Sequence, residues 1–183
     1  ALIKVLQDDR DSQVRQAAVT ALGAMGHDQA AVTAVIQALQ DPDNKVGQAA
    51  ATALGAMGGA SADTAVTAEF QALQNPNELV QRRQAAATAL GAMGGPKARA
   101  ALMQALQDRD NHIRQAAATA LSKMVDAQAR AALIKVLQNP SELVQRRQAA
   151  ATALGAMGGP QARAALIQAL QDDRDSQVRQ AGA

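Results

Sequence analysis

The sequence predicts an all-α solenoid of about six antiparallel helix pairs. Two short strings, Gln-Ala and Leu-Gln, alternate along the whole chain at intervals of 31 to 36 residues, a period typical of stacked helical repeats. Alanine, the best helix former, supplies 47 of the 183 residues. Apolar residues around each string recur with a helical period. The glutamines of the first string are Gln16, Gln48, Gln84, Gln115, Gln148 and Gln180, and the leucines of the second are Leu6, Leu39, Leu73, Leu106, Leu137 and Leu170.

The Gln-Ala string lies in a first kind of helix, helix A, expected over residues 13–26 in the first repeat. Val14, Ala18, Ala21, Leu22 and Met25 fall on one face of a 3.6-residue period there. Glycine adopts the left-handed conformation at a helix C-terminus at little cost, which predicts four A-helix ends at Gly26, Gly58-Gly59, Gly94-Gly95 and Gly158-Gly159.

Two further features of the A helices depend on single residues. One repeat lacks the terminal glycines, and there Asp126 is expected to cap the next helix directly. Glycines inside the A helices should each cost about 1 kcal/mol relative to alanine. We therefore expect a neighbouring helix to approach closely at Gly23, Gly55, Gly91 and Gly155.

The Leu-Gln string lies in the second kind of helix, helix B. Residues 131–137 show its apolar stripe in Leu133, Ile134 and Leu137. Pro96 and Pro160 are expected to open B helices, since proline suits the first helical turn. Asn75 and Asn139 each precede a proline and stand three residues before a glutamate, and Asp41 also precedes a proline. This pattern predicts all three as N-caps of A helices.

The A-helix motif carries a family resemblance. Residues 14–23, read as V-R-x-A-A-x-x-A-L-G, resemble helix A of a HEAT-like repeat, and the motif recurs from Val46, Ile113 and Val178 and in variant form from Val80 and Val144. The subtype is similar to repeats of the phycobilisome-lyase type. This resemblance implies a right-handed solenoid with A helices on the convex side and B helices on the concave side.

The resemblance covers residues 1–183 as one array, which begins in a B helix and ends in a truncated A helix. Gly47 replaces the motif arginine, and two repeats hold two extra residues before Gln-Ala, as in 80–84, which predicts a longer helix or a shifted cap. The ends lack polar capping repeats, so we expect a section of a longer array that can stack head-to-tail.

Two segments of the array are almost identical. Residues 73–108 and 137–172 differ at three of 36 positions. Recent tandem duplication and artificial consensus design both explain this identity. The irregular lengths of the loops favour duplication, because designed arrays are usually idealised.

The composition excludes several classes of protein. Cysteine, tryptophan and tyrosine are absent, so no disulfide framework or cysteine-based metal site is expected. No apolar run is long enough to span a membrane, and no signal peptide is visible. We therefore expect a cytoplasmic protein, although the N-terminus, which begins with alanine, can be a trimmed one.

Catalytic chemistry is not expected. His27 and His112 have no partner residues on a shared face and are interpreted as surface residues. Acidic clusters between B and A helices are interpreted as helix caps rather than cation ligands; they lie at Asp8-Asp9, Asp41-Asp43, Asp108-Asp110 and Asp172-Asp173-Asp175. We predict a protein without catalytic residues, metal or cofactor.

Arginines recur in the A helices at Arg15, Arg83, Arg114, Arg147 and Arg179 and near the start of the last three B helices at Arg99, Arg130 and Arg163. Such a series can follow a phosphate backbone, or it can bond an aspartate of the neighbouring repeat. Interspersed acids and a net charge of only +2 favour the structural interpretation.

The B helices offer the preferred binding surface. The position two residues before the recurring leucine is polar in every copy: Lys4, Gln37, Gln71, Gln104, Lys135 and Gln168. This position is either simply the solvent side of an amphipathic helix or the lining of a concave groove. We predict a non-catalytic scaffold that binds an unidentified protein or peptide there. The alternatives are a bilin-lyase-like factor that attaches chromophores to phycobiliproteins, which the resemblance implies, and nucleic-acid binding through the arginines.

Two neighbouring residues depart from the B-helix pattern. Phe70, the only aromatic residue, is expected to fill the core rather than to contact a partner. Glu69 stands where other copies have leucine or valine, and the sequence offers no account of it.

Overall fold

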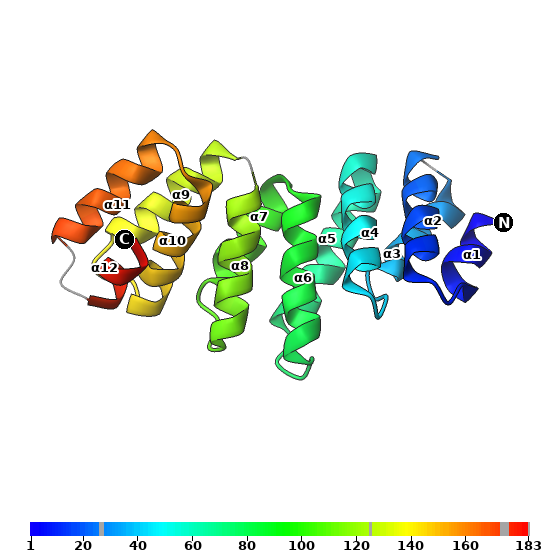
Figure 1. Cartoon of the computed structure of the whole chain (residues 1–183), viewed down its shortest axis with the longest axis horizontal. Coiled ribbons are helices and arrows are strands. Elements are labelled where there is room, and N and C mark those ends of the chain that lie inside the picture. The colour runs from blue at the N-terminus through cyan, green and yellow to red at the C-terminus, as the bar shows by residue number, and fades with distance from the viewer. Residues whose placement is uncertain (26–27, 125, 173–175, 183) are drawn as a thin grey trace. The chain divides into compact units, whose positions relative to one another are not determined.

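The computed structural model describes residues 1–25, 28–124, 126–172 and 176–182. These residues form twelve α-helices and no strand (Figure 1). They confirm the all-α solenoid that the repeats predict, while its handedness stays a prediction. The helices are α1 (Leu2–Asp8), α2 (Ser12–Ala24), α3 (Gln29–Ala38), α4 (Asn44–Met57), α5 (Gly59–Gln74), α6 (Val80–Met93), α7 (Gly95–Ala105), α8 (Asn111–Lys123), α9 (Ala127–Gln138), α10 (Val144–Met157), α11 (Pro160–Asp172) and α12 (Ser176–Gly182).

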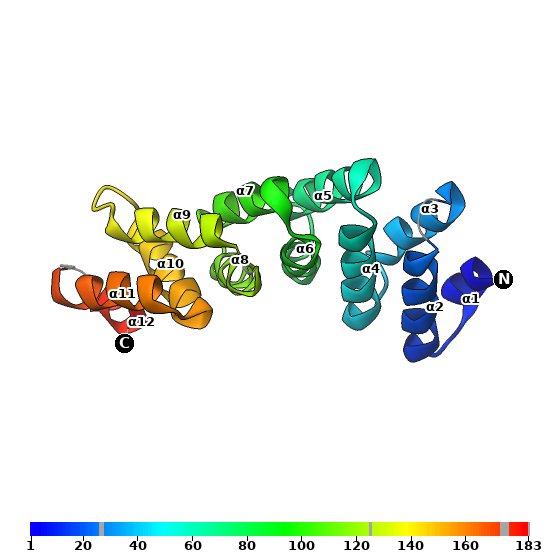
Figure 2. The ribbon, with the colours of Figure 1, turned by 90° about the horizontal axis from the view of Figure 1, so that it is seen from above.

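The chain divides into two compact units, residues 1–98 and 99–183, with the boundary inside α7. In the first unit, the A helices α2, α4 and α6 pack in sequence, and the B helices pack against them. Figure 2 shows α3 and α5 along one side of this unit and the A helices along the other. In the second unit, α10 packs against α8 and α12, and it also contacts the B helices α9 and α11.

The core consists largely of small side chains. In α4, Ala50, Ala51 and Leu54 are fully buried, and so is Val46 in the first turn. The predicted apolar face of the first A helix is only partly buried, since Val14 in α2 is 39% exposed and Met25, directly after α2, is 61% exposed. The difference arises because α4 lies between two A helices, whereas α2 contacts α4 alone among them.

Close helix packing explains some of the interior glycines. A Cβ atom on Gly23 would lie 2.7 Å from the Cβ of Ala53, and one on Gly55 would lie 2.9 Å from the carbonyl oxygen of Met93. The predicted close approach is therefore confirmed at these two positions. It is wrong at Gly155, where no atom of the described residues lies within 4 Å of the position of a Cβ atom.

Glycine ends three A helices as predicted. Gly58, Gly94 and Gly158 have φ angles between 61° and 69°, the left-handed region that favours glycine. Gly26 lies outside the described residues. Asp126 caps α9 as predicted, with its Oδ1 accepting from the Gln128 amide at 2.8 Å.

The N-cap predictions at Asn75, Asn139 and Asp41 are wrong. Asn75 and Asn139 follow the last residues of α5 and α9. The Asn75 side chain accepts from the Asn77 amide at 3.0 Å, and its carbonyl accepts from the Glu78 amide at 3.2 Å, so local turn chemistry competes with capping. The actual N-cap of α4 is Asp43, two residues after Asp41.

The two extra residues in the variant repeats are taken up before the helix. Helix α6 has 14 residues, the same length as α4, and its N-cap is Leu79, which makes no side-chain cap bond. Helix α10 repeats this arrangement with Leu143. Of the two possibilities that the insertion predicts, the shifted cap is confirmed and the longer helix is wrong.

Candidate functional site

The B helices expose a polar side chain at the position that the sequence predicts for partner binding. In the first unit these residues are Lys4, Gln37 and Gln71, and in the second unit they are Gln104, Lys135 and Gln168; all six are exposed. The leucine two residues later is buried in five of the six helices, and the exception is Leu170 at 37% exposure. This geometry leaves the polar side chains accessible, and their role in binding stays a prediction.

In the second unit, one side chain of this row forms a hydrogen bond with the adjacent B helix. The Gln168 Oε1 atom accepts from Gln138 Nε2 at 3.0 Å between α11 and α9. Both side chains are exposed, so this bond contributes little to stability.

Of the acidic clusters between B and A helices, Asp43 and Asp110 cap the following helix as predicted, whereas Asp41 and Asp108 accept from the amides of these caps; Asp11, outside the predicted clusters, caps α2. The side chains of Asp11, Asp43 and Asp110 accept from the amide two residues later at 2.8, 2.8 and 2.7 Å. Hydrogen bonds from the side chain of Ser12 and then the Lys45 amide hold the pKa of Asp43 below its usual range. The carboxylates of Asp11, Asp43 and Asp110 therefore accept hydrogen bonds from backbone amides at the helix N-termini.

The described part of the chain holds no cluster of metal-ligating side chains. No group of three or more His, Asp or Glu side chains among the described residues is arranged to hold a metal ion. His112 is exposed in the first turn of α8, as predicted. His27, Asp173 and Asp175 lie outside the described residues.

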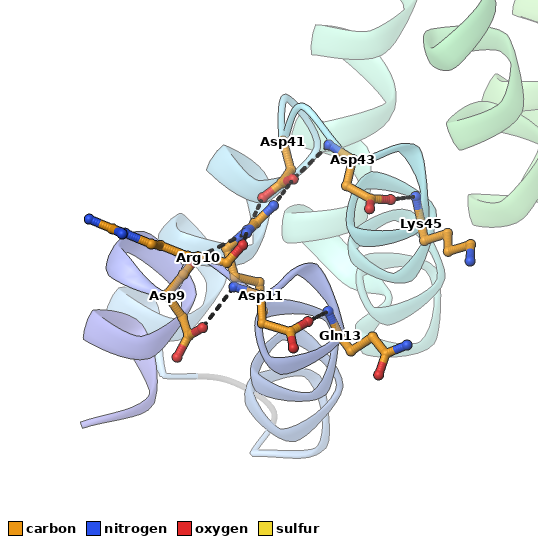
Figure 3. A network of polar contacts seen from close by, with 8 residues as sticks. Asp9, Arg10, Asp11, Gln13, Asp41, Asp43 and Lys45 are labelled. Carbon is orange, nitrogen blue, oxygen red and sulfur yellow. Dashed lines mark hydrogen bonds and ion pairs between the residues drawn. The ribbon is translucent and has the colours of Figure 1, made fainter.

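Arg15 joins the first two repeats. Its Nε and Nη2 atoms donate to the two carboxylate oxygens of Asp41, each at 2.8 Å, and its Nη1 atom donates to the carbonyls of Asp9 and Arg10 at 3.0 and 3.2 Å. Figure 3 shows how Asp41 also accepts from the Asp43 amide. The Arg15 hydrogen bonds hold the pKa of Asp41 below its usual range. The structural interpretation of the arginine series is therefore confirmed at this position.

Arg114 keeps only part of this pattern. Its Nη1 atom donates to the carbonyls of Asp108 and Arg109 at 2.8 and 2.9 Å, and its Nη2 atom donates to Asn111 Oδ1 at 3.1 Å. The following loop has Asn139 where the second repeat has Asp41, so no carboxylate occupies that position. The two loop carbonyls are thus the constant acceptors of the first and fourth repeats, and the acidic partner is variable.

Gly47 interrupts the arginine series, and a cavity of about 510 Å³ opens beside it. The cavity lies between α6 and the start of α4 with the loop before it, and its lining includes Asp41, Asn44 and Arg82. A second cavity of about 580 Å³ lies between α2 and α4 beside Gly23. Both belong to the A-helix layer. The sequence shows that Gly47 departs from the motif but does not show the cavity.

Glu69 forms a buried ion pair that sequence reasoning missed. Its side chain in α5 accepts from both Nη atoms of Arg82 in α6 at 2.7 Å, and the residue is only 1% exposed. The Glu69 hydrogen bonds raise the pKa of Arg82. Arg82 belongs to the lengthened 80–84 segment, so an acid at an apolar B-helix position together with an added arginine is the signal that could have revealed the pair. Phe70, the next residue, is half-buried.

The almost identical segment in the second unit arranges its arginine differently. Leu133 stands in α9 at the position of Glu69 and is fully buried. Arg146 binds Glu142, with Nη1 at 2.6 Å from each carboxylate oxygen. With the side-chain amide of Gln107 turned so that its oxygen faces Arg146, that oxygen also accepts from Nη1 and Nη2 of Arg146 at 2.7 and 3.0 Å. The partner of this arginine is therefore decided by one residue on the neighbouring B helix.

Comparison with known families accounts for these repeats. A profile of HEAT repeats matches residues 1–71, 69–149 and 123–183. The chain belongs to the HEAT repeat family. No curated protein matches this HEAT repeat chain, and no described helix is both long and apolar enough to cross a bilayer.

Solved structures show the same HEAT-type fold. Human deoxyhypusine hydroxylase in complex with glycerol is 23% identical, with a TM-score of 0.51 over 99% of this chain and 81% of that chain. The YibA protein of Escherichia coli is 20% identical, with a TM-score of 0.51 over 99% and 67% of the two chains. The CpcE–CpcF complex of phycocyanin lyase from Nostoc sp. PCC7120 is 22% identical, with a TM-score of 0.49 over 86% and 96%. The first two similarities, with identities below 25%, show the fold alone, and the third, with a TM-score below 0.5, supports no conclusion about this chain.

Proposed function

We propose that this HEAT repeat chain is a non-catalytic cytoplasmic scaffold that binds a protein or an extended peptide along its B helices. The observation that supports the proposal is the exposed polar side chain that recurs in each B helix two residues before a leucine, which is buried in five of the six helices. HEAT repeats suit this role, because stacked helices present a regular surface that a single repeat cannot provide.

The chemistry of the row suits a polypeptide partner. Four of the six residues are glutamines, whose amides both donate and accept hydrogen bonds and therefore match a peptide backbone. Each such bond contributes about 0.5–1.5 kcal/mol net. Useful affinity thus requires several repeats to bind together, which an array supplies.

Two triple variants in the second unit test the proposal. Gln104→Ala/Lys135→Ala/Gln168→Ala removes the row there, and Gln115→Ala/Thr119→Ala/Thr152→Ala is a matched control at exposed positions of the A helices α8 and α10. A partner captured from cells is measured by titration calorimetry against both variants. We expect the first triple to weaken binding at least tenfold and the control to stay within twofold. Equal affinity for wild type and the first triple would overturn the proposal.

The alternatives have their own readouts. Salt-dependent binding of a DNA duplex would favour nucleic acid as the ligand. Transfer of a bilin to its apoprotein during incubation with the chain would favour the lyase-like factor. Head-to-tail association through the ends of the array predicts a sedimentation coefficient that rises with concentration, and a constant monomer would contradict that association.

A further inference from the structure

Gly47 leaves a gap in the arginine series of the A helices. The loops that precede α4 and α8 have the same length and the same hydrogen bonds. Asp41 and Asp108 accept from the amide two residues later at 2.8 and 2.9 Å. Asp43 and Asp110, which cap α4 and α8, do the same at 2.8 and 2.7 Å. The hydrogen bonds of Arg114 in the fourth repeat therefore show which groups an arginine at position 47 would bind in the second repeat.

The acceptors that Arg114 uses have counterparts around Gly47. Arg114 donates to the carbonyls of Asp108 and Arg109 and to Asn111 Oδ1. The corresponding groups in the second repeat are the carbonyls of residues 41 and 42 and the amide oxygen of residue 44, where the sequence again has Asp and Asn at the first and third of these positions. No backbone N–H of the described residues donates to either of the two carbonyls.

The space for a side chain is present as well. The cavity of about 510 Å³ includes Asp41, Asn44 and Gly47 in its lining, and its volume lies in the usual range of about 300–1,000 Å³ for ligand pockets. Its two charged lining groups already have partners inside the first unit, since Asp41 binds Arg15 and Arg82 binds Glu69. An entering cation therefore meets no uncompensated positive charge, and the amides of Gln48 and Gln84 in the lining offer further acceptors.

We propose that this pocket binds the guanidinium group of an arginine side chain from a partner protein, in place of the arginine that Gly47 lacks. A guanidinium is favoured over an ammonium because its planar fork of donors can bond several acceptors at once, as Arg114 does with two adjacent carbonyls and an amide oxygen. Asp41 and Asn44, which supply two of the three corresponding acceptors, line the pocket. The pocket lies in the A-helix layer and is separate from the B-helix row, so this site goes beyond the proposed function and can be tested independently of it.

The test uses the full chain and a capped arginine, N-acetyl-L-arginine methylamide, as the probe. We follow the backbone amide signals of the chain by ¹H–¹⁵N NMR during titration. We expect saturable shifts centred on Asn44, Gly47 and Gln48, with a dissociation constant at least fivefold lower than that of the matching lysine compound.

Three variants show whether the shifts come from the pocket. Gly47→Arg fills the pocket with the chain's own guanidinium and should abolish the shifts. Gly47→Ala adds only a Cβ atom, 3.2 Å from the Leu39 carbonyl oxygen, and should keep them. Asn44→Ala removes one acceptor on the surface and should weaken binding at least threefold. Probe binding that is unchanged in Gly47→Arg, or equal for the arginine and lysine compounds, would overturn the proposal.

Discussion

The buried pair of Glu69 and Arg82 should respond very differently to the loss of each partner. Replacing Arg82 by methionine leaves a carboxylate at 1% exposure without its cation. Breaking a buried pair in this way typically costs about 3–5 kcal/mol, so we expect Arg82→Met to destabilise the first unit by this amount.

Replacing Glu69 by leucine should cost much less. The position of Glu69 is occupied by the fully buried Leu133 in the second unit, so a leucine is compatible with this packing. The freed Arg82 can bind Glu78, just as Arg146 binds Glu142 four residues earlier. Exchange of a buried ion pair for apolar contacts is often neutral or stabilising, and we expect Glu69→Leu to stay within about 1 kcal/mol of wild type.

The assay is urea unfolding followed by circular dichroism at 222 nm, with hydrogen exchange to assign the loss to the first unit. Arg146→Met is the matched control, because the side chains of its pair are 15% and 23% exposed and no carboxylate is left fully buried; it should cost about 1 kcal/mol or less. The double variant Glu69→Leu/Arg82→Met should recover most of the loss of Arg82→Met. The reasoning is refuted if Arg82→Met costs no more than Arg146→Met, or if Glu69→Leu is as costly as Arg82→Met.

Further predictions concern single sites. Gly155→Ala should raise the free energy of unfolding, measured by thermal unfolding, by about 0.5–1 kcal/mol. Gly55→Ala should lower it by about 1–3 kcal/mol, because the Cβ atom would lie 2.9 Å from a carbonyl oxygen. A change of the same sign in both variants would contradict the packing argument. The lowered pKa of Asp41 means that its stabilisation is present above the unfolded value of about 3.9 and is lost as pH falls through the lower folded value. The stability gap between wild type and Asp41→Asn, measured by urea midpoints, should therefore be constant from pH 7 to 5 and shrink towards pH 3; a gap that grows in acid would refute this sign. Leu137→Ala should lower the free energy of unfolding by about 2–5 kcal/mol, because Leu137 is buried, whereas Gln104→Ala should lower it by less than about 0.5 kcal/mol, because Gln104 is exposed. Similar melting temperatures of the two variants would contradict this prediction.

Local rules predict the helix ends well where one residue type has no competing role. A glycine with positive φ ends the A helices at Gly58 and Gly94, and Asp126 caps α9, all as the sequence predicts. Local rules fail at Asn75, because the same side chain suits both a helix cap and a turn, and the two extra residues decide in favour of the turn. The sequence alone does not show whether Asn75 caps a helix or forms a turn.

Packing is less predictable because identical strings lie in different surroundings. Gly55 and Gly155 both stand in the string Leu-Gly-Ala-Met-Gly-Gly. One approaches the backbone of the next A helix, and the other faces open space. The effect of an interior glycine on stability therefore depends on the helix beside it, and the repeat motif does not specify that helix.

The candidate sites differ in the same way. The polar B-helix position follows from helical periodicity, since a residue opposite an apolar stripe is exposed wherever the helix packs. The cavity at Gly47 requires two facts at once: the absence of one side chain, which the sequence shows, and the persistence of the loop that would bind it, which only the hydrogen bonds of Asp41 and Asp43 reveal. A loop that collapsed around the missing arginine would have left no acceptors for a partner. Hydrogen bonds to backbone amides, and not an arginine side chain, hold this loop. The loop therefore keeps the acceptors that bind Arg114 in the fourth repeat, although the second repeat has no arginine there.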